Sequence, residues 1–554
     1  MTKTSRRLLL LLALTVLTSP VVFAVRVERL IDTWQPKHYV VDLTLNDQLS
    51  EIVTGSARID VLILKKTSVI DLDFGELKTN SVRVDSKPAS FTHRNGKLEI
   101  TLSEPANPGT KLVVDVAYQG RPKDGLIMSK DKDGLPSAVG DNWPNRVHHW
   151  IPSLDHPSAK ATITFNITVS ARQEVVANGR LQDVQTSAGG NRTWTYSIGA
   201  PIPPYCMIIA VGQFARIEPS AKTPVPIAYY VPGSDRNVAV KGFAPTIPSL
   251  EYFNEIIAPY PYEKLAMIVG ATQFGGMENA SAIVFTSTLF NPKQRVKISK
   301  RYGIPKGTVA LIAHEIAHQW FGDSVTESTW ADLWLSEGFA TYFAGLFVQR
   351  YEGEDSFQEY MKTAADSVFA YEKRKLTPIF DRDTENLMDL LNANNYQKGA
   401  WVLHMLRSSL GDDVFFRGIR DYYHAHKDGT ASTEDLRAAL EKASGKDLKD
   451  FFQRWVYGVG HPKYHVDAKY QARQGEIRVV LRQVQPGDPF PDPVPIRVTT
   501  DEGGRPYELI MKPNGKEAVA TLKLRNVLPG KTLLRYNVQV DPQKTLLKEV
   551  TIRP

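Results

Sequence analysis

The sequence predicts a multidomain α+β protein with three folded parts, and three observations predict it. Residues 26–217 alternate apolar and polar side chains with the period of two that is typical of β-strands. Residues 235–460 place apolar side chains at helical spacing, and the period of two returns from residue 464 onward. At about 150 residues per domain, a chain of 554 residues is long enough for three or four domains.

An N-terminal antiparallel β-domain is expected over residues 25–218. Clean alternation predicts strands at Ala57–Ile63, Leu98–Leu102 and Thr162–Val169, and turn residues such as Asn95–Gly96 separate them. Three prolines between residues 218 and 226 indicate a linker to the next domain.

Residues 219–462 are expected to form a mainly helical domain. Long helices are predicted at Gly307–Phe321 and Ala331–Tyr351, and another begins at Ser432–Asp435 and ends at Gly445. Residues 463–554 return to short alternating segments such as Ile477–Leu481, separated by Gly and Pro turns, and predict a small C-terminal β-sandwich.

The first 24 residues have the form of an export signal. Lys3, Arg6 and Arg7 precede the mostly apolar run Leu8–Leu17, and Val22–Ala24 offers a small-residue cleavage site. We therefore expect a secreted protein, periplasmic or extracellular, with no membrane span in the mature chain. The alternative is a membrane anchor formed by an uncleaved N-terminal segment.

Composition excludes several classes of function. A net charge of +7, scattered along the chain, is too mild to predict a nucleic-acid partner. The single cysteine, Cys206, excludes an intrachain disulfide framework and a zinc site with several cysteines. Any metal site must therefore use His, Asp and Glu.

The segment His314–His318 reads H-E-x-x-H inside a predicted helix. Residues four apart share one helical face, so both imidazoles can reach one zinc ion, with Glu315 placed to take a proton from a zinc-bound water. Glu337 follows His318 by 19 residues on the next predicted helix and can complete a set of two histidines and one glutamate. Two histidines on a salt-bridged helix are the alternative interpretation.

Upstream, Gly275–Asn279 reads G-G-M-E-N. Paired glycines allow a peptide backbone to approach closely, and the single acid, Glu278, can hold a substrate cation. With the H-E-x-x-H motif, Glu337 and the Tyr396–Gly399 segment Y-Q-K-G, this box makes the chain resemble the gluzincin aminopeptidase family that includes aminopeptidase N and leukotriene hydrolase.

The resemblance implies a thermolysin-like catalytic domain and a zinc-dependent aminopeptidase that binds one Zn²⁺ per chain and acts on peptides with a free N-terminus. His314, His318 and Glu337 would bind zinc, Glu315 would activate the zinc-bound water, and Tyr396 would stabilise the oxyanion. The substrate-binding residues would be Gly275, Gly276, Met277, Glu278 and Asn279, with Glu278 holding the α-amine.

The sequence departs from the family in two places. Relatives often add a Gln or Glu from the N-terminal domain to the amine site, whereas the matching position here falls on Trp143, so Asn142 is the predicted helper. Second, many relatives carry a large C-terminal helical domain, whereas this chain resembles a short form of the family without it.

Three other functions remain to be weighed: a zinc endopeptidase, a bifunctional peptidase and lipid-epoxide hydrolase, and a non-catalytic binding protein. The box that contains Glu278 disfavours the endopeptidase. The missing helical domain disfavours the epoxide hydrolase, and the intact set of catalytic residues disfavours the non-catalytic binding protein. The preferred N-terminal residue, the physiological substrate and the oligomeric state are not fixed by the sequence.

Overall fold

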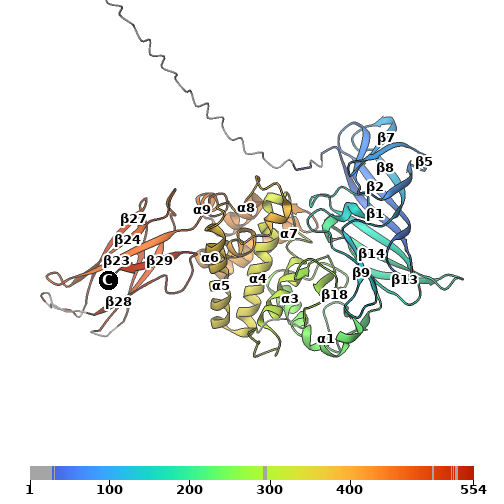
Figure 1. Cartoon of the computed structure of the whole chain (residues 1–554). Coiled ribbons are helices and arrows are strands. Elements are labelled where there is room, and N and C mark those ends of the chain that lie inside the picture. The colour runs from blue at the N-terminus through green and yellow to red at the C-terminus, as the bar shows by residue number, and fades with distance from the viewer. Residues whose placement is uncertain are drawn as a thin grey trace, which may run out of the picture.

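The computed structural model describes residues 28–29, 32–290, 296–501, 505–525, 527, 530 and 535–553. Its three parts lie in a row, with the β-rich N-terminal part at one end, the helical part in the middle and the C-terminal sheets at the other end (Figure 1). The predicted α+β architecture is confirmed. The predicted export signal, residues 1–24, lies outside the described residues.

The N-terminal part is built on an eight-stranded sheet in the order β13-β14-β11-β1-β2-β8-β4-β5. Side chains of β11 (Ala161–Val169) alternate between buried and partly exposed, as the period of two predicts. Its neighbour β1 (Trp34–Leu45) runs parallel to it, whereas the other pairs of this sheet are antiparallel. The period of two is the same in both kinds of pair, so the sequence pattern does not distinguish them.

Two smaller sheets, β12-β15-β10-β9 and β3-β7-β6, complete this part. The remaining N-terminal strands are β2 (Ile52–Ile63), β3 (Thr67–Asp73), β4 (Lys78–Val84), β5 (Lys87–Pro88), β6 (Ser90–Arg94), β7 (Lys97–Ala106), β8 (Lys111–Gly120), β9 (Leu126–Lys130), β10 (Pro136–Gly140), β12 (Glu174–Ala177), β13 (Arg180–Thr186), β14 (Arg192–Ile202) and β15 (Ile209–Gly212).

The central part contains a five-stranded sheet where the sequence predicts mainly helices. Its strands, in spatial order, are β16 (Ala215–Ile217), β17 (Ile227–Val231), β18 (Leu265–Gly270), β20 (Ala282–Thr286) and β19 (Gly276–Met277). Nearly every residue of β17, β18 and β20 is buried. Strands buried on both faces show no alternation, which is why the period of two does not reveal them.

Helices make up most of the rest of the central part. They are α1 (Arg236–Gly242), α2 (Thr246–Ile256), α3 (Lys306–His318), α4 (Trp334–Glu352), α5 (Glu354–Glu372), α6 (Gly399–Leu410), α7 (Asp412–His426), α8 (Thr433–Ser444) and α9 (Lys449–Trp455), with a π-helical turn at Asn394–Lys398 and a short parallel pair of β21 (Thr326–Glu327) and β22 (Thr430–Ala431).

Local signals account for two features of these helices. At the start of α8, the Ser432 hydroxyl accepts a hydrogen bond from the Asp435 N–H, and the Asp435 carboxylate accepts one from the Ser432 N–H. At its end, Gly445 adopts the left-handed conformation, so α8 begins and ends as predicted. Helices α4 and α6 approach closely where Gly338 meets Gly399. A Cβ on Gly338 would lie only 2.9 Å from the Gly399 Cα, so glycine is needed at this contact. This contact brings the π-helical turn against α4.

The C-terminal part is a sandwich of two sheets, β27-β24-β23-β29 and β26-β25-β28. Its strands are β23 (Lys463–Gln471), β24 (Glu476–Gln483), β25 (Val494–Thr500), β26 (Tyr507–Met511), β27 (Glu517–Lys523), β28 (Tyr536–Val540) and β29 (Glu549–Arg553). The sandwich has a hydrophobic core of its own, but Phe490 and Leu547 pack into the core of the central part. The two parts are therefore joined by buried apolar contacts.

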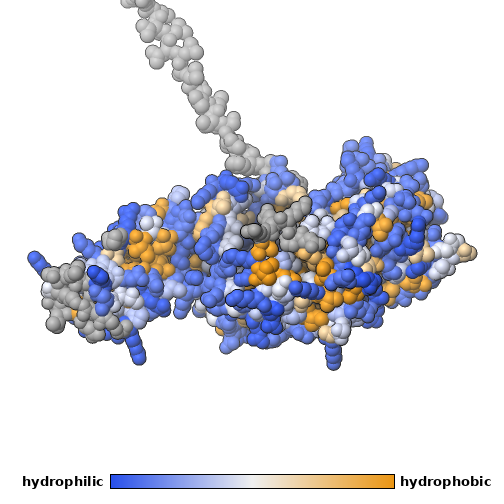
Figure 2. Space-filling model, turned by 60° about the horizontal axis from the view of Figure 1, so that its bottom comes forward, coloured by the Kyte–Doolittle hydropathy of each residue, from blue (hydrophilic) through white to orange (hydrophobic). Residues whose placement is uncertain are grey.

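On the face that Figure 2 shows, hydrophilic residues cover most of the surface and apolar residues gather in separate patches. In the described part of the chain, no helix is both long and apolar enough to cross a membrane.

Candidate active site

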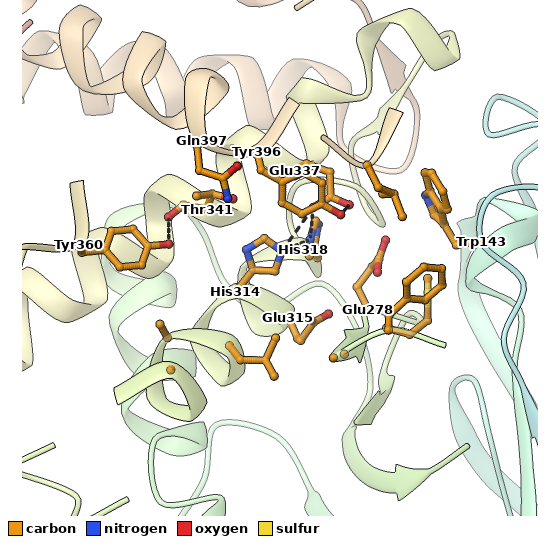
Figure 3. A pocket seen from close by; sticks show the side chains of 18 residues that line it. Trp143, Glu278, His314, Glu315, His318, Glu337, Thr341, Tyr360, Tyr396 and Gln397 are labelled. Carbon is orange, nitrogen blue, oxygen red and sulfur yellow. Dashed lines mark hydrogen bonds and ion pairs between the residues drawn. The ribbon is translucent and has the colours of Figure 1, made fainter. Parts of the chain in front are cut away.

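Helix α3 and the first turn of α4 bring three potential metal ligands together. The Nε2 atoms of His314 and His318 lie 3.0 Å apart, and Glu337 Oε2 lies 3.3 Å from each of them. Figure 3 shows the three side chains converging at the centre of the pocket. The structure thus brings together the three residues that the sequence predicts as ligands.

These residues fit a zinc ion. Glu337 Oε2 is buried, accepts no hydrogen bond from the described residues, and lies 3.3 Å from each of the two imidazoles. Two imidazoles and one carboxylate are a ligand set of catalytic zinc sites. His318 Nδ1 lies 3.1 Å from the Phe321 carbonyl, and an N–H donated there leaves Nε2 free to bind the metal.

The electrostatics of the pocket also favour a cation. Burial opposes ionisation of Glu337, but the nearby His318 and His314 outweigh it and lower the pKa of Glu337 to about 2. Burial is the main cause that raises the pKa of Glu278 to about 7 and the pKa of Glu315 well above its usual value. Three buried carboxylates in one pocket are most easily accommodated beside a positive charge.

Glu315 lies on α3 beneath the edge strand β19. A Cβ on Gly276 would lie 2.4 Å from Glu315 Oε1, so only glycine lets the strand pass this close to the carboxylate. Gly276 is held in place by pairing with Phe285 of β20. The first role that the structure gives Gly276 is therefore to make room for Glu315.

Tyr396 projects from the π-helical turn. Its hydroxyl donates to Glu337 Oε1 at 2.8 Å, and its ring is stacked at 6.0 Å and 6° from the ring of His314. The phenol thus lies beside the ligand set, within reach of a group bound there.

Glu278 lies at the opposite side of the ligand set from Thr341, Tyr360 and Gln397 (Figure 3). Ligand atoms of Glu278, Glu315 and His318 lie within 4.8 Å of one another, so the Glu278 carboxylate points toward the metal site. Beyond it stand the rings of Trp143 and Phe274, packed edge to face at 6.1 Å.

Four of the five predicted substrate-binding residues line the pocket: Gly275, Gly276, Met277 and Glu278. The fifth, Asn279, is fully buried, and its side-chain amide donates to the Met277 carbonyl.

The prediction that Asn142 helps to hold the amine is wrong. Its amide nitrogen donates to the Met207 carbonyl, and its oxygen accepts from the Trp150 indole, so both ends are engaged inside the protein. Trp143, not Asn142, reaches the pocket. Asn142 and Trp143 lie where the chain enters a turn, so adjacent side chains face different surroundings, and the sequence does not show which of them reaches the pocket.

The pocket has a volume of about 400 Å³, and a second cavity of about 420 Å³ adjoins it between α3, α4 and α5. The two share five lining residues: Gly307, Ala310, Thr341, Tyr360 and Gln397. The sequence reasoning did not single out these five. The signal for two of them was present, because Gly307 and Ala310 precede His314 by seven and four residues and therefore share its helical face.

An H-E-x-x-H helix and a glutamate from the helix that follows define a gluzincin metal site. Family models match this chain twice: the peptidase M1 N-terminal domain at residues 35–206 and the peptidase family M1 domain at residues 243–455. The chain belongs to peptidase family M1, and this family implies zinc at the site.

Relatives of this chain include Aminopeptidase 2 of Candida albicans, 26% identical over 80% of this chain and 49% of the relative. Another is Probable aminopeptidase 1 of Sulfurisphaera tokodaii, 27% identical over 72% of this chain and 50% of the relative. The chain spans about half the length of these curated relatives. The crystal structure of the M1 zinc metallopeptidase from Deinococcus radiodurans aligns with a TM-score of 0.65 at 25% identity, covering 78% of this chain and 95% of that one.

Proposed function

We propose that the protein is a zinc-dependent aminopeptidase that removes single residues from the N-terminus of peptides. The observation that carries this proposal is Glu278, a buried carboxylate that faces the metal site from the end of the pocket where Trp143 and Phe274 stand. The protonated α-amine of a peptide is the natural partner of such a carboxylate. An amine held there leaves only the first peptide bond at the metal site.

His314, His318 and Glu337 would hold one zinc ion per chain. When bound, zinc acts as a Lewis acid that polarises the carbonyl of the scissile bond and makes water a stronger nucleophile. Glu315 takes the proton from the attacking water and delivers it to the leaving amine. The Tyr396 hydroxyl donates a hydrogen bond to the oxyanion that develops on the carbonyl.

The arrangement of the pocket supports one direction of substrate binding. With the amine at Glu278, the chain beyond the scissile bond points toward Tyr360, Thr341 and Gln397 on the other side of the ligand set (Figure 3). These residues border the second cavity, which can receive the part of the peptide that leaves.

An endopeptidase is the main rival, since the metal site alone would serve it equally well. It requires a cleft that lets the chain continue past both sides of the metal. The carboxylate of Glu278 and the rings behind it favour a bound chain end over a continuing chain.

The test compares aminoacyl reporters with free and N-acetylated amines, on the zinc-loaded protein and on Glu278→Ala. We expect hydrolysis that stops on chelation, near-inert acetylated substrates, and a variant that keeps its zinc but loses most of its preference for free amines. If Glu278→Ala loses the same factor of activity on free and on acetylated substrates, Glu278 only supports the structure of the glycine-rich segment. Efficient internal cleavage of an acetylated peptide by the wild-type protein would overturn the aminopeptidase proposal.

A further inference from the structure

The π-helical turn that carries Tyr396 has two faces. Tyr396 and Gln397 line the pocket, whereas Asn394, Asn395 and Lys398 are buried, with exposed fractions of 1%, 1% and 0%. The turn is fixed along its own backbone by the Lys398 N–H, which donates to the Ala393 carbonyl five residues back. Single π-helical turns are uncommon and occur often at functional sites, so the groups that hold this one bear on the position of Tyr396.

Two of the buried side chains make local, neutral anchors. Asn394 Nδ2 donates to the Thr377 carbonyl and Asn395 Nδ2 donates to the Leu390 carbonyl, each at 2.7 Å. Both acceptors lie fewer than 20 residues away along the chain. These bonds tie the turn to the segment that leads into it.

Lys398 makes a different kind of anchor. Its Nζ donates to Glu372 Oε1 of α5 at 2.8 Å and to the Gly460 carbonyl at 2.8 Å. The side chains of this ion pair are 0% and 4% exposed. A buried ion pair is weak evidence for added stability, because removing two charges from water offsets their attraction. A pair of this kind does, however, allow only one arrangement of its charged groups.

The ion pair continues into the C-terminal sandwich. The second oxygen of Glu372 accepts a hydrogen bond from His461 Nδ1, and the ring of His461 packs at 4.4 Å from that of Phe369. His461 Nε2 lies 3.4 Å from Glu549 Oε2 on β29, which also pairs with Lys463 Nζ at 2.7 Å. A continuous set of polar side-chain contacts therefore runs from the π-helical turn, through α5, to two strands of the sandwich.

We propose that Lys398 is a positioning residue for Tyr396, and that through Glu372 and His461 the C-terminal sandwich supports the active site. This inference rests on the oxyanion role proposed above for Tyr396. Lys398 lies two residues after Tyr396 and points away from the pocket, so it acts on substrate only through the turn.

The test is a double-mutant cycle between Lys398→Met and Tyr396→Phe, with kcat, KM and zinc content measured for each protein. A small displacement of a reacting group lowers rates by up to about a hundredfold, so we expect Lys398→Met to lower kcat by about ten- to a hundredfold with KM nearly unchanged. In the Tyr396→Phe background, the same substitution should lower kcat by less than about twofold, because the donor that it misplaces is already gone.

Lys132→Met is the matched control. Lys132 forms an ion pair with the buried Asp235, with exposed fractions of 25% and 3%, and neither residue is in the described lining of the pocket or in the set of contacts from Lys398 to Glu549. Its loss should lower the melting temperature and leave kcat unchanged. If it lowers kcat as much as Lys398→Met does, any buried ion pair has this effect and the proposal fails.

Other outcomes are equally decisive. Equal losses of kcat from Lys398→Met in both backgrounds would overturn the positioning role while leaving the proposed function intact. A Tyr396→Phe parent with unchanged kcat would overturn the oxyanion role and this inference with it. If Lys398→Met does not fold, the double variant Lys398→Met/Glu372→Gln removes both charges, keeps an acceptor for His461, and takes its place in the cycle with the same expected coupling.

Discussion

The two ends of helix α3 contrast sharply. At its C-terminal end, Glu315 and His318 are 3% and 1% exposed, and the strand β19 passes so close that Gly276 has no room for a Cβ. At its N-terminal end, a Cβ built on Gly307 would meet no atom of the described residues within 4 Å. One helix thus has a tightly packed end and an open end, and both face the same pocket.

The difference follows from what each end has to do. Catalytic groups act only when they are held within a fraction of an ångström, and close packing on all sides provides this. The recognition of a variable peptide requires space instead. Gly307 has neither a left-handed backbone nor a crowded neighbour to explain it. It lies in the first turn of α3 and lines both cavities, where the absence of a side chain leaves space.

The largest expected effect lies at the packed end. Glu315→Gln should retain zinc and lose at least about 10²–10⁴-fold in kcat, because it removes a base and leaves the ligands in place. Glu337→Gln should lose zinc itself. Turnover and metal content after dialysis separate the two, and equal loss of metal from both variants would contradict this division of roles.

The packed end of α3 is also the part that could be predicted from sequence. Helical geometry places the two histidines, four residues apart, on one face, and the spacing to Glu337 together with the family resemblance predicts the third ligand; the structure brings the three side chains together. The wall opposite could not be predicted in this way. Strands β17, β18 and β20 are buried on both faces, so they lack the alternation that reveals a strand, and the pairing that positions Gly276 over Glu315 depends on them.

The open end and the buried supports escaped prediction for another reason. Which cavity a residue lines depends on tertiary packing, so Gly307 carries no mark in the sequence beyond its helical spacing from His314, and Tyr360 of α5 carries none. Lys398 belonged to a recognised segment, but its partner Glu372 at the end of α5, and His461 beyond it just before β23, lie outside that segment. Trp143 was noticed only as a departure from a family pattern.

A smaller effect is expected where strand β19 packs against Glu315 at the C-terminal end of α3. Gly276→Ala should place a methyl group where Glu315 Oε1 now lies, and we expect about a hundredfold loss of kcat with zinc retained. Gly275→Ala is the matched control, since a Cβ there would lie 3.6 Å from Leu311 Cδ2, an ordinary contact. Steady-state kinetics of both variants provide the measurement. If the two lose activity equally, the glycines serve substrate binding rather than the position of Glu315.

The smallest effect is expected at the open end, and it should be a change of selectivity. Gly307→Leu adds a side chain at the boundary that the two cavities share, where a Cβ would meet no atom of the described residues within 4 Å. Peptides with a bulky residue after the scissile bond should then lose about tenfold in kcat/KM, the scale of a small steric mismatch in a pocket, while peptides with glycine there should be unaffected.

Gly307→Ala separates this effect from helix stability. It should raise the free energy of unfolding by about 0.4–1 kcal/mol, because the unfolded chain loses freedom, yet add little bulk at the boundary of the cavities and leave the selectivity close to wild type. The measurement is kcat/KM for a set of peptides that share one N-terminal residue and carry Gly, Leu or Phe next. If Gly307→Leu lowers all three by the same factor, this boundary does not receive the leaving part of the peptide. In that case the open end of α3 would be open for a reason other than substrate, and the contrast between the two ends would concern stability rather than recognition.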